Sequence, residues 1–158
     1  MAEEKTNVMR LLDQEKIPYT PRQYDVSDGT LDAVTAAERM GVDSMSCFKT
    51  LVTMGASKKN YVFVIPGAME LDLKAAAKAA GEKSIEMLKQ AQLLPLTGYI
   101  HGGCSPVGMK KRFPTFIDTS AQGLEEMTVS AGKVGHQVTL APQALASFVG
   151  ARFAPVAK

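Results

Sequence analysis

The most distinctive stretch of this sequence is a glycine-rich segment, residues 97–108, which contains four glycines and one proline. Glycine lets backbone N–H groups turn outward and approach a ligand where a Cβ atom would block access. The spacing matches neither of the phosphate-binding loops G-x-x-x-x-G-K-[ST] and G-x-G-x-x-G. From spacing alone, a ligand-binding backbone loop and a tight connection between two elements are equally good interpretations.

Two residues with reactive side chains, His101 and Cys104, lie three positions apart inside this segment. A metal site needs three or four ligands, and the other soft ligands, His136 and Cys47, are each isolated in the chain, so we expect no metal. A Cys104 nucleophile with a histidine base stays open, because such a pairing is spatial and not sequential. A small, buried, unreactive cysteine is the more common case and is the favoured interpretation.

Lys49 stands out because it lies in an otherwise apolar segment with strand-like alternation. Such a lysine either reaches solvent from a sheet edge, which is the more common case, or projects into a cavity where its charge is used. The run 110–112, Lys-Lys-Arg, is typical of a solvated face, but beside a glycine-rich loop it is a candidate phosphate-contacting patch. Asp118, at the end of a strand, is a turn residue or a carboxylate that orients a donor.

The composition is that of one ordinary globular domain, and we expect residues 1–158 to form it. Hydrophobic residues make up 46% of the chain and charged residues 22%, while 18 Lys and Arg against 16 Asp and Glu leave a net charge of +2. This balance argues against indiscriminate coating of nucleic acid but not against a local basic site. Two cysteines, no secretory leader and no apolar run of about 20 residues favour a cytoplasmic protein without a membrane span.

Hydrophobic periodicity and capping residues predict the elements that position these groups. We expect helices at 6–15, 30–40, 72–80 and 142–148, and strands at 22–26, 47–54, 61–65, 115–118, 128–130 and 137–140, the second and third strands forming a hairpin. The segment 84–92 is compatible with a strand or a helix. Short strands among helices, without a regular βαβ rhythm, predict an α+β domain with a mixed or antiparallel sheet.

Six short motifs occur together in an order and spacing that resemble the YbaK/EbsC family. They are Phe48-Lys49-Thr50-Leu51, Leu71-Asp72-Leu73-Lys74, Thr97-Gly98-Tyr99, Gly102-Gly103-Cys104-Ser105-Pro106-Val107-Gly108, Lys110-Lys111-Arg112 and Ser130-Ala131-Gly132-Lys133. Each motif is weak alone, but the resemblance extends from Val8 to about Phe153. It implies a single α+β domain whose mixed, barrel-like β-sheet is flanked by helices.

The resemblance also implies a function, because this family is related to the editing domain inserted in some prolyl-tRNA synthetases. It implies a freestanding, cofactor-free aminoacyl-tRNA deacylase that hydrolyses the ester joining a wrong amino acid to the 3′ end of a tRNA. The implied substrate is Cys-tRNA(Pro), bound by its acceptor end, and a prolyl-tRNA synthetase is a further candidate partner. Ala-tRNA(Pro) or another mischarged tRNA is the alternative substrate, and a non-catalytic tRNA- or nucleotide-binding module is the alternative from another class.

Site residues follow from the same resemblance, position by position. Lys49 would contact the substrate's carbonyl or terminal nucleotide, and the backbone amides of Gly102 and Gly103 would hold the ester carbonyl as charge develops on it. The substrate would also be bound by Tyr24, Phe48, Thr50, Leu51, Gly98, Tyr99, Ser105, Pro106, Ser130 and Gly132. Four basic residues would bind the tRNA, namely Lys110, Lys111, Arg112 and Lys133.

The mechanism that the family implies uses no protein nucleophile: the substrate's own cysteine thiol attacks its ester and gives a cyclic thioester. This agrees with a sequence that has no convincing triad, and it makes a catalytic role for Cys104 unnecessary. One departure concerns the residues after Gly135. Relatives often carry an acidic residue there, whereas this chain reads His136-Gln137.

Overall fold

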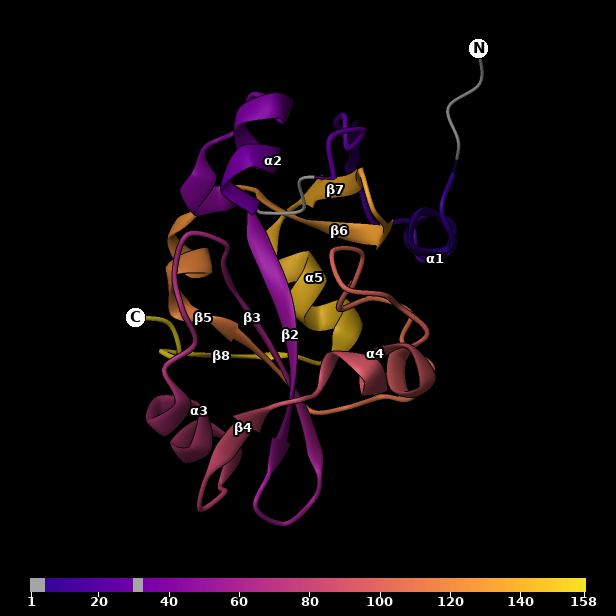
Figure 1. Ribbon diagram of the computed structural model, residues 1–158. Coiled ribbons are helices and arrows are strands. Elements are labelled where there is room, and N and C mark those ends of the chain that lie inside the picture. The colour runs from indigo at the N-terminus through magenta and orange to yellow at the C-terminus, as the bar shows by residue number, and fades with distance from the viewer. Residues whose placement is uncertain (1–4, 30–32) are drawn as a thin grey trace.

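The computed structural model of the protein describes residues 5–29 and 33–158, in which helices and short strands alternate irregularly (Figure 1). The helices are α1 (Asn7–Gln14), α2 (Ala33–Met40), α3 (Leu73–Ala80), α4 (Gln90–Thr97) and α5 (Pro142–Val149), with short 3-10 turns at Ser44–Ser46 and Thr119–Gly123. The strands are β1 (Thr20–Gln23), β2 (Phe48–Gly55), β3 (Asn60–Pro66), β4 (Ile85–Met87), β5 (Thr115–Asp118), β6 (Met127–Lys133), β7 (His136–Leu140) and β8 (Arg152–Ala154). The predicted α+β class is confirmed.

The described strands form two open sheets rather than one barrel. A five-stranded mixed sheet has the order β4-β2-β3-β5-β8, in which β2 is antiparallel to β3 and β4, while the β3-β5 and β5-β8 pairs are parallel. A three-stranded antiparallel sheet has the order β1-β7-β6. Figure 1 shows the small sheet with α1 and α2 near one end of β2, and α3 and β4 toward the other end. The mixed sheet flanked by helices agrees with the prediction. The predicted barrel-like closure is absent, because the described strands form two open sheets.

Strand β3 is the centre of the large sheet, and its continuous apolar run explains why both faces of the sheet are covered. Val62 and Val64 belong to a core shared with α1, α5 and the small sheet. Phe63 and Ile65 belong to a second core shared with α3, where Phe63 stacks on Phe116 at a ring-centroid distance of 5.4 Å. Two cores therefore fix the β2-β3 hairpin from opposite sides.

The helix ends follow the capping residues expected from the sequence. Thr6 Oγ1 accepts a hydrogen bond from a backbone amide in the first turn of α1, and the Asp72 carboxylate accepts two in the first turn of α3. Gly81 ends α3 in the left-handed conformation, with φ of 73°. None of the described helices is long and apolar enough to cross a membrane.

Several element boundaries differ from the sequence-based expectation. The strand expected at 22–26 is β1, which ends at Gln23, so Tyr24 follows the strand. Residues 30–32 of the helix expected at 30–40 lie outside the described residues, and the rest of that helix is α2. The ambiguous segment 84–92 contains β4 and the start of α4. The sequence does not predict α4, which contains Pro95, or β8, which is a three-residue strand paired only with β5.

Asp118 ends β5 and ties the C-terminal segment to the large sheet. Its Oδ1 accepts hydrogen bonds from the amides of Val156 and Ala157, each at 3.0 Å. Burial alone would raise the pKa of Asp118, but these bonds and those from Ser120 outweigh burial and hold the pKa below its usual value. Asp118 therefore has both roles left open by the sequence: it caps the turn Thr119–Gly123 by accepting from Ser120 N, and it orients the amides of Val156 and Ala157.

Candidate active site

Part of the predicted site, including Lys49 and Gly102, lines a cavity at the start of β2. Its volume is about 450 Å³, which lies within the range of about 300–1,000 Å³ typical of small-ligand sites. The walls come from β2, β6 and β7, from α2 and α4, and from the segments that follow β1, β3 and α4. They are formed by Tyr24, Ala33, Phe48, Lys49, Thr50, Leu51, Gly67, Leu93, His101, Gly102, Cys104, Ser130 and Gln137.

The cavity follows the part of β2 that has no strand partner on one side among the described residues. β4 pairs with β2 only at Thr53–Gly55, and Phe48–Leu51 precede this pairing. The Leu88 amide donates to the Val52 carbonyl at 3.1 Å across this edge. Because main-chain groups alternate in direction along a strand, those of Thr50 point to the same edge. Main-chain groups of β2 are therefore available to a ligand beside residues Phe48–Leu51.

Apart from the run 110–112, which is described below, seven of the predicted site residues line this cavity and seven do not. The lining residues are Tyr24, Phe48, Lys49, Thr50, Leu51, Gly102 and Ser130. The others are Gly98, Tyr99, Gly103, Ser105, Pro106, Gly132 and Lys133. Lys49 makes no ion pair with any residue in the described ranges, so its charge is available to a ligand.

Tyr99 organises the glycine-rich loop rather than lining the cavity. Its hydroxyl donates to the Val107 carbonyl, and its ring occupies the space beside two glycines with positive φ, Gly108 (77°) and Gly132 (91°). A Cβ atom at Gly132 would lie 2.9 Å from the Tyr99 ring. Burial raises the pKa of Tyr99 to about 12, so its phenol stays protonated and keeps donating. The three residues therefore act together to fix the loop against β6.

The two adjacent glycines at 102 and 103 have different surroundings. Gly103 N donates to the Ile100 carbonyl at 3.0 Å, and a Cβ atom there would lie 3.2 Å from Val134 N. Gly102, with φ of 87°, borders the cavity, and its amide donates to none of the described residues. Of these two amides, that of Gly102 has no acceptor among the described residues, while Gly103 allows the loop to approach the β6-β7 turn.

Ser105 is fully buried and supports the same loop. Its Oγ accepts a hydrogen bond from Val107 N at 3.2 Å. Ser130, by contrast, lines the cavity, and its Oγ accepts from Gly132 N at 3.1 Å. The Ser130 hydroxyl proton is left to donate toward a ligand.

Tyr24 is fixed at the cavity by contacts with β7 and the turn before it. Its backbone amide donates to the Gly135 carbonyl at 3.0 Å, and its phenol lies near the Gln137 side chain, which also lines the cavity. Burial raises the pKa of the Tyr24 phenol, so the group is protonated at neutral pH and can donate. Gln137 thereby connects the departure from the family pattern, His136-Gln137, to the cavity.

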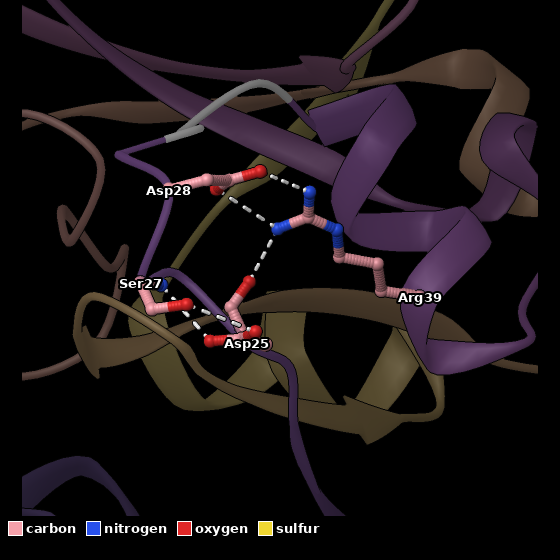
Figure 2. A network of polar contacts seen from close by, with 4 residues as sticks. All are labelled: Asp25, Ser27, Asp28 and Arg39. Atoms are coloured by element: carbon pink, nitrogen blue, oxygen red, sulfur yellow. Dashed lines mark hydrogen bonds and ion pairs between the residues drawn. The ribbon is translucent and has the colours of Figure 1, made fainter.

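Figure 2 shows how α2 is joined to the segment that follows Tyr24. The Arg39 guanidinium donates to the Asp25 backbone carbonyl and to both carboxylate oxygens of Asp28, at 3.2 and 2.6 Å. The Asp25 carboxylate accepts from the amide and hydroxyl of Ser27. Because α2 and Tyr24 both line the cavity, this network joins two of its walls.

The two cysteines are buried and poorly suited to nucleophilic attack. Burial raises the pKa of the Cys47 thiol to about 11 and that of the Cys104 thiol to about 12. At neutral pH both are therefore thiols, whereas the thiolate is the reactive form. The part of the chain that the structure describes holds no group of three or more His, Cys, Asp or Glu side chains that could bind a metal ion.

The Thr50 hydroxyl is the one buried side-chain polar atom without a hydrogen-bond partner in the described part of the chain. Three residues farther along β2, the Thr53 hydroxyl is also buried but donates to the Tyr61 carbonyl at 2.9 Å. An unsatisfied buried polar group costs stability. Its presence in a residue that lines the cavity makes Thr50 a candidate ligand-contacting residue.

The basic residues predicted to bind tRNA lie beyond the glycine-rich loop. Lys110, Lys111 and Arg112 line a second cavity of about 320 Å³, which also includes Pro106. Lys110 lies over Gly98, which explains the glycine there: a Cβ atom would lie 3.3 Å from the lysine side chain. Lys133 is on the exposed end of β6, beside the loop.

Six lining residues are outside the predicted site; His101, Cys104 and Gln137 were noted in the sequence, whereas Ala33, Gly67 and Leu93 were not. Gly67 follows β3, and a Cβ atom there would lie 2.1 Å from the Ala33 Cβ, so the glycine lets α2 approach. The sequence signal that could have pointed to Gly67 is the Pro-Gly pair that follows a buried strand. Ala33 and Leu93 reach the cavity only through tertiary packing, and no local pattern marks them.

Comparison with known proteins identifies the class to which this fold and site belong. A family model described as "Aminoacyl-tRNA editing domain" matches residues 28–148. A relative from Enterococcus faecalis, named "Putative Cys-tRNA(Pro)/Cys-tRNA(Cys) deacylase EbsC", is 47% identical over 154 residues, which cover 98% of this chain and 94% of the relative. The chain belongs to the YbaK/EbsC family of aminoacyl-tRNA editing domains. It is an aminoacyl-tRNA deacylase, and tRNA is part of its substrate.

Solved structures support the same fold. The crystal structure of "a putative trans-editing enzyme for prolyl tRNA synthetase" matches with a TM-score of 0.82 at 23% identity and covers 99% of both chains. The crystal structure of a hypothetical protein matches with a TM-score of 0.86 at 22% identity, covering 96% of this chain and 99% of the other. The described residues therefore share the fold of these two solved structures.

Proposed function

We propose that this protein is a trans-editing enzyme that removes cysteine from Cys-tRNA(Pro), and that the thiol of the substrate is the nucleophile. The observation that supports this substrate is the 47% identity, across nearly the whole chain, to a relative whose name includes Cys-tRNA(Pro) deacylase. The cavity supports the mechanism, because it offers a cation, Lys49, and a backbone donor, Gly102, beside a cysteine whose pKa of about 12 makes it a poor nucleophile.

The proposed reaction starts with the terminal adenosine ester in the first cavity. The substrate thiol, whose unperturbed pKa is about 8.5, loses its proton, and the sulfur attacks the ester carbonyl carbon. Lys49 and the Gly102 amide stabilise the negative charge that develops on the carbonyl oxygen. The C–O bond to the ribose then breaks, the ribose oxygen takes up a proton, and a cyclic thioester leaves, which water hydrolyses to free cysteine.

Such an enzyme is needed because a prolyl pocket cannot reject cysteine strongly. A difference of one or two methylene-sized groups changes binding by only about 1–3 kcal/mol, so a second site has to remove the error. A thiol-dependent mechanism would also protect correctly charged Pro-tRNA(Pro), because proline carries no thiol. Selectivity would then come from the substrate's chemistry in addition to the shape of the cavity.

The weak overall charge favours a partner in tRNA selection. A net charge of +2 gives little non-specific attraction to phosphates, whereas the cluster at 110–112 is local. We infer that the protein acts in the cytoplasm as one domain, residues 1–158, that it needs no cofactor, and that prolyl-tRNA synthetase holds the remainder of the tRNA.

The test is a panel of mischarged tRNAs, each incubated with and without prolyl-tRNA synthetase. We expect rapid deacylation of Cys-tRNA(Pro), little of Ala-tRNA(Pro), and an increase on adding the synthetase. Ser-tRNA(Pro), which replaces the thiol by a hydroxyl, is the matched control and should be stable. Rapid loss of alanine with retention of cysteine would contradict the proposed substrate, and binding without turnover of any substrate would indicate a non-catalytic module.

A further inference from the structure

The second cavity combines a basic rim with apolar and aromatic walls. Its volume is about 320 Å³. Lys110, Lys111 and Arg112 are exposed at its rim. The half-buried Met109, Phe113, Phe148 and Val149 each pack on the large core on one side and line the cavity as well.

One rigid loop forms part of both cavities. Cys104 lines the first cavity and Pro106 the second. Because a chain spans at most about 3.3–3.6 Å per residue, their Cα atoms lie no more than about 7 Å apart. Tyr99, through its hydrogen bond to the Val107 carbonyl, holds this stretch in place. The two cavities therefore lie on neighbouring parts of the same loop.

We propose that the second cavity binds the base of the nucleotide that precedes the terminal adenosine of the substrate tRNA. The inference rests on the proposed function, which places the terminal adenosine and its ester in the first cavity. Proteins bind single-stranded nucleic acid by combining cations that follow the backbone with aromatic side chains on which bases stack. Those two components occur together here, next to the cavity in which the strand ends.

The residues of this cavity have three roles: base contact, phosphate contact and positioning. The aromatic faces of Phe113 and Phe148 receive the base. Lys110 and Lys111 form no ion pair with any residue in the described ranges and contact the phosphate that links the two nucleotides. The Arg112 guanidinium donates to the Phe148 carbonyl at 3.3 Å, where a cation is also favoured by the C-terminal end of α5. Arg112 is therefore a positioning residue that holds α5 against the rim.

The test compares two small substrates that differ by this one nucleotide: cysteinyl-adenosine and the cysteinyl ester of the dinucleotide CpA. For the unmodified protein we expect kcat/KM to be about tenfold higher with the dinucleotide. This is the size of effect expected when one base stacks on an aromatic side chain. Phe148→Leu keeps an apolar side chain but removes the aromatic face. It should abolish most of this advantage while leaving kcat/KM for cysteinyl-adenosine within about twofold of the unmodified protein.

Phe153→Leu is the matched control, because Phe153 is also half-buried against the large core but lines neither cavity. It should keep the tenfold advantage. An equal loss with both substrates in Phe148→Leu, or an unchanged advantage in that variant, would overturn the inference. If the unmodified protein hydrolyses neither small substrate nor Cys-tRNA(Pro), the proposed function fails instead, so the two failures are distinguishable.

Discussion

The two walls of the first cavity differ in how their polar groups are used. The strand wall, formed by Phe48–Leu51 of β2 with Ser130 of β6, presents a lysine without an ion pair and a threonine hydroxyl without a partner among the described residues. The loop wall belongs to the glycine-rich loop, residues 98–108, which lines the cavity through His101, Gly102 and Cys104. In this loop the Tyr99 hydroxyl, the Ser105 hydroxyl and the Gly103 amide all bind main-chain groups of the loop itself. The strand wall is available to substrate, whereas most of the loop wall holds itself together.

This contrast has a consequence for mutagenesis. Substitutions that remove the Lys49 ammonium or the Thr50 hydroxyl should reduce activity and leave stability nearly unchanged, because these two groups have no ion-pair or hydrogen-bond partner among the described residues. Substitutions in the loop wall should first reduce stability, because the groups they remove are structural. Both walls were assigned to substrate binding by family resemblance, so separate measurements of unfolding and deacylation are needed to distinguish them.

The largest effect is expected for Lys49→Ala in the strand wall. Loss of a group that stabilises developing charge typically costs about 10²–10³ in rate, so we expect at least a hundredfold lower kcat for Cys-tRNA(Pro) with an unchanged urea unfolding midpoint. Lys59→Ala, in the exposed turn between β2 and β3, is the matched control and should be fully active. Activity of Lys49→Ala within a few-fold of the unmodified protein would remove the lysine from the mechanism.

The next largest effect is expected for Gly132→Ala, which tests the loop wall. At φ of 91° an alanine is strained, and its Cβ atom would lie 2.9 Å from the Tyr99 ring and 3.2 Å from Val8. We expect the free energy of unfolding to fall by about 2 kcal/mol or more, measured by urea denaturation. Gly123→Ala, where a Cβ atom meets nothing within 4 Å, should be neutral. Full stability of Gly132→Ala would show that the loop is not fixed by Tyr99.

Two threonines on β2 provide a finer comparison within one strand. Thr53→Val removes a hydroxyl that donates to the Tyr61 carbonyl, and we expect it to lower the free energy of unfolding by about 1 kcal/mol and to keep full activity. Thr50→Val removes a buried hydroxyl without a partner, so stability should be unchanged or slightly higher, while kcat/KM should fall about tenfold. The reverse pattern would place the ligand-contacting hydroxyl at Thr53 instead.

Much of the secondary structure was predictable from local signals. The β2-β3 hairpin, α3 between Asp72 and Gly81, and β5 follow from alternation, capping and turn residues that act over a few positions. The parallel pairing of β3 with β5 and of β5 with β8 was not predictable, because it joins segments far apart in the chain. The same holds for the division into two open sheets.

Residues of the candidate site were predictable only where they belong to a motif of the family. Phe48–Leu51 line the cavity as the family resemblance implies. Tyr99 and Ser105 belong to the same set of motifs, but residue type does not reveal that their hydroxyls turn toward the Val107 backbone. Leu93 lines the cavity from α4, a helix that the sequence does not predict. Side-chain direction and tertiary contact, rather than composition, therefore separate the two walls.

The smallest effect is expected for Cys104→Ser, although Cys104 is part of the loop wall and lines the cavity. Burial raises the pKa of this thiol to about 12, which disfavours the reactive thiolate at neutral pH. A serine of nearly the same size should therefore keep activity on Cys-tRNA(Pro) within about threefold, and Cys47→Ser serves as the control for replacing a buried thiol that does not line the cavity. If Cys104→Ser unfolds like the unmodified protein but is inactive, the nucleophile belongs to the enzyme, and the loop wall, not the substrate, supplies the reacting sulfur.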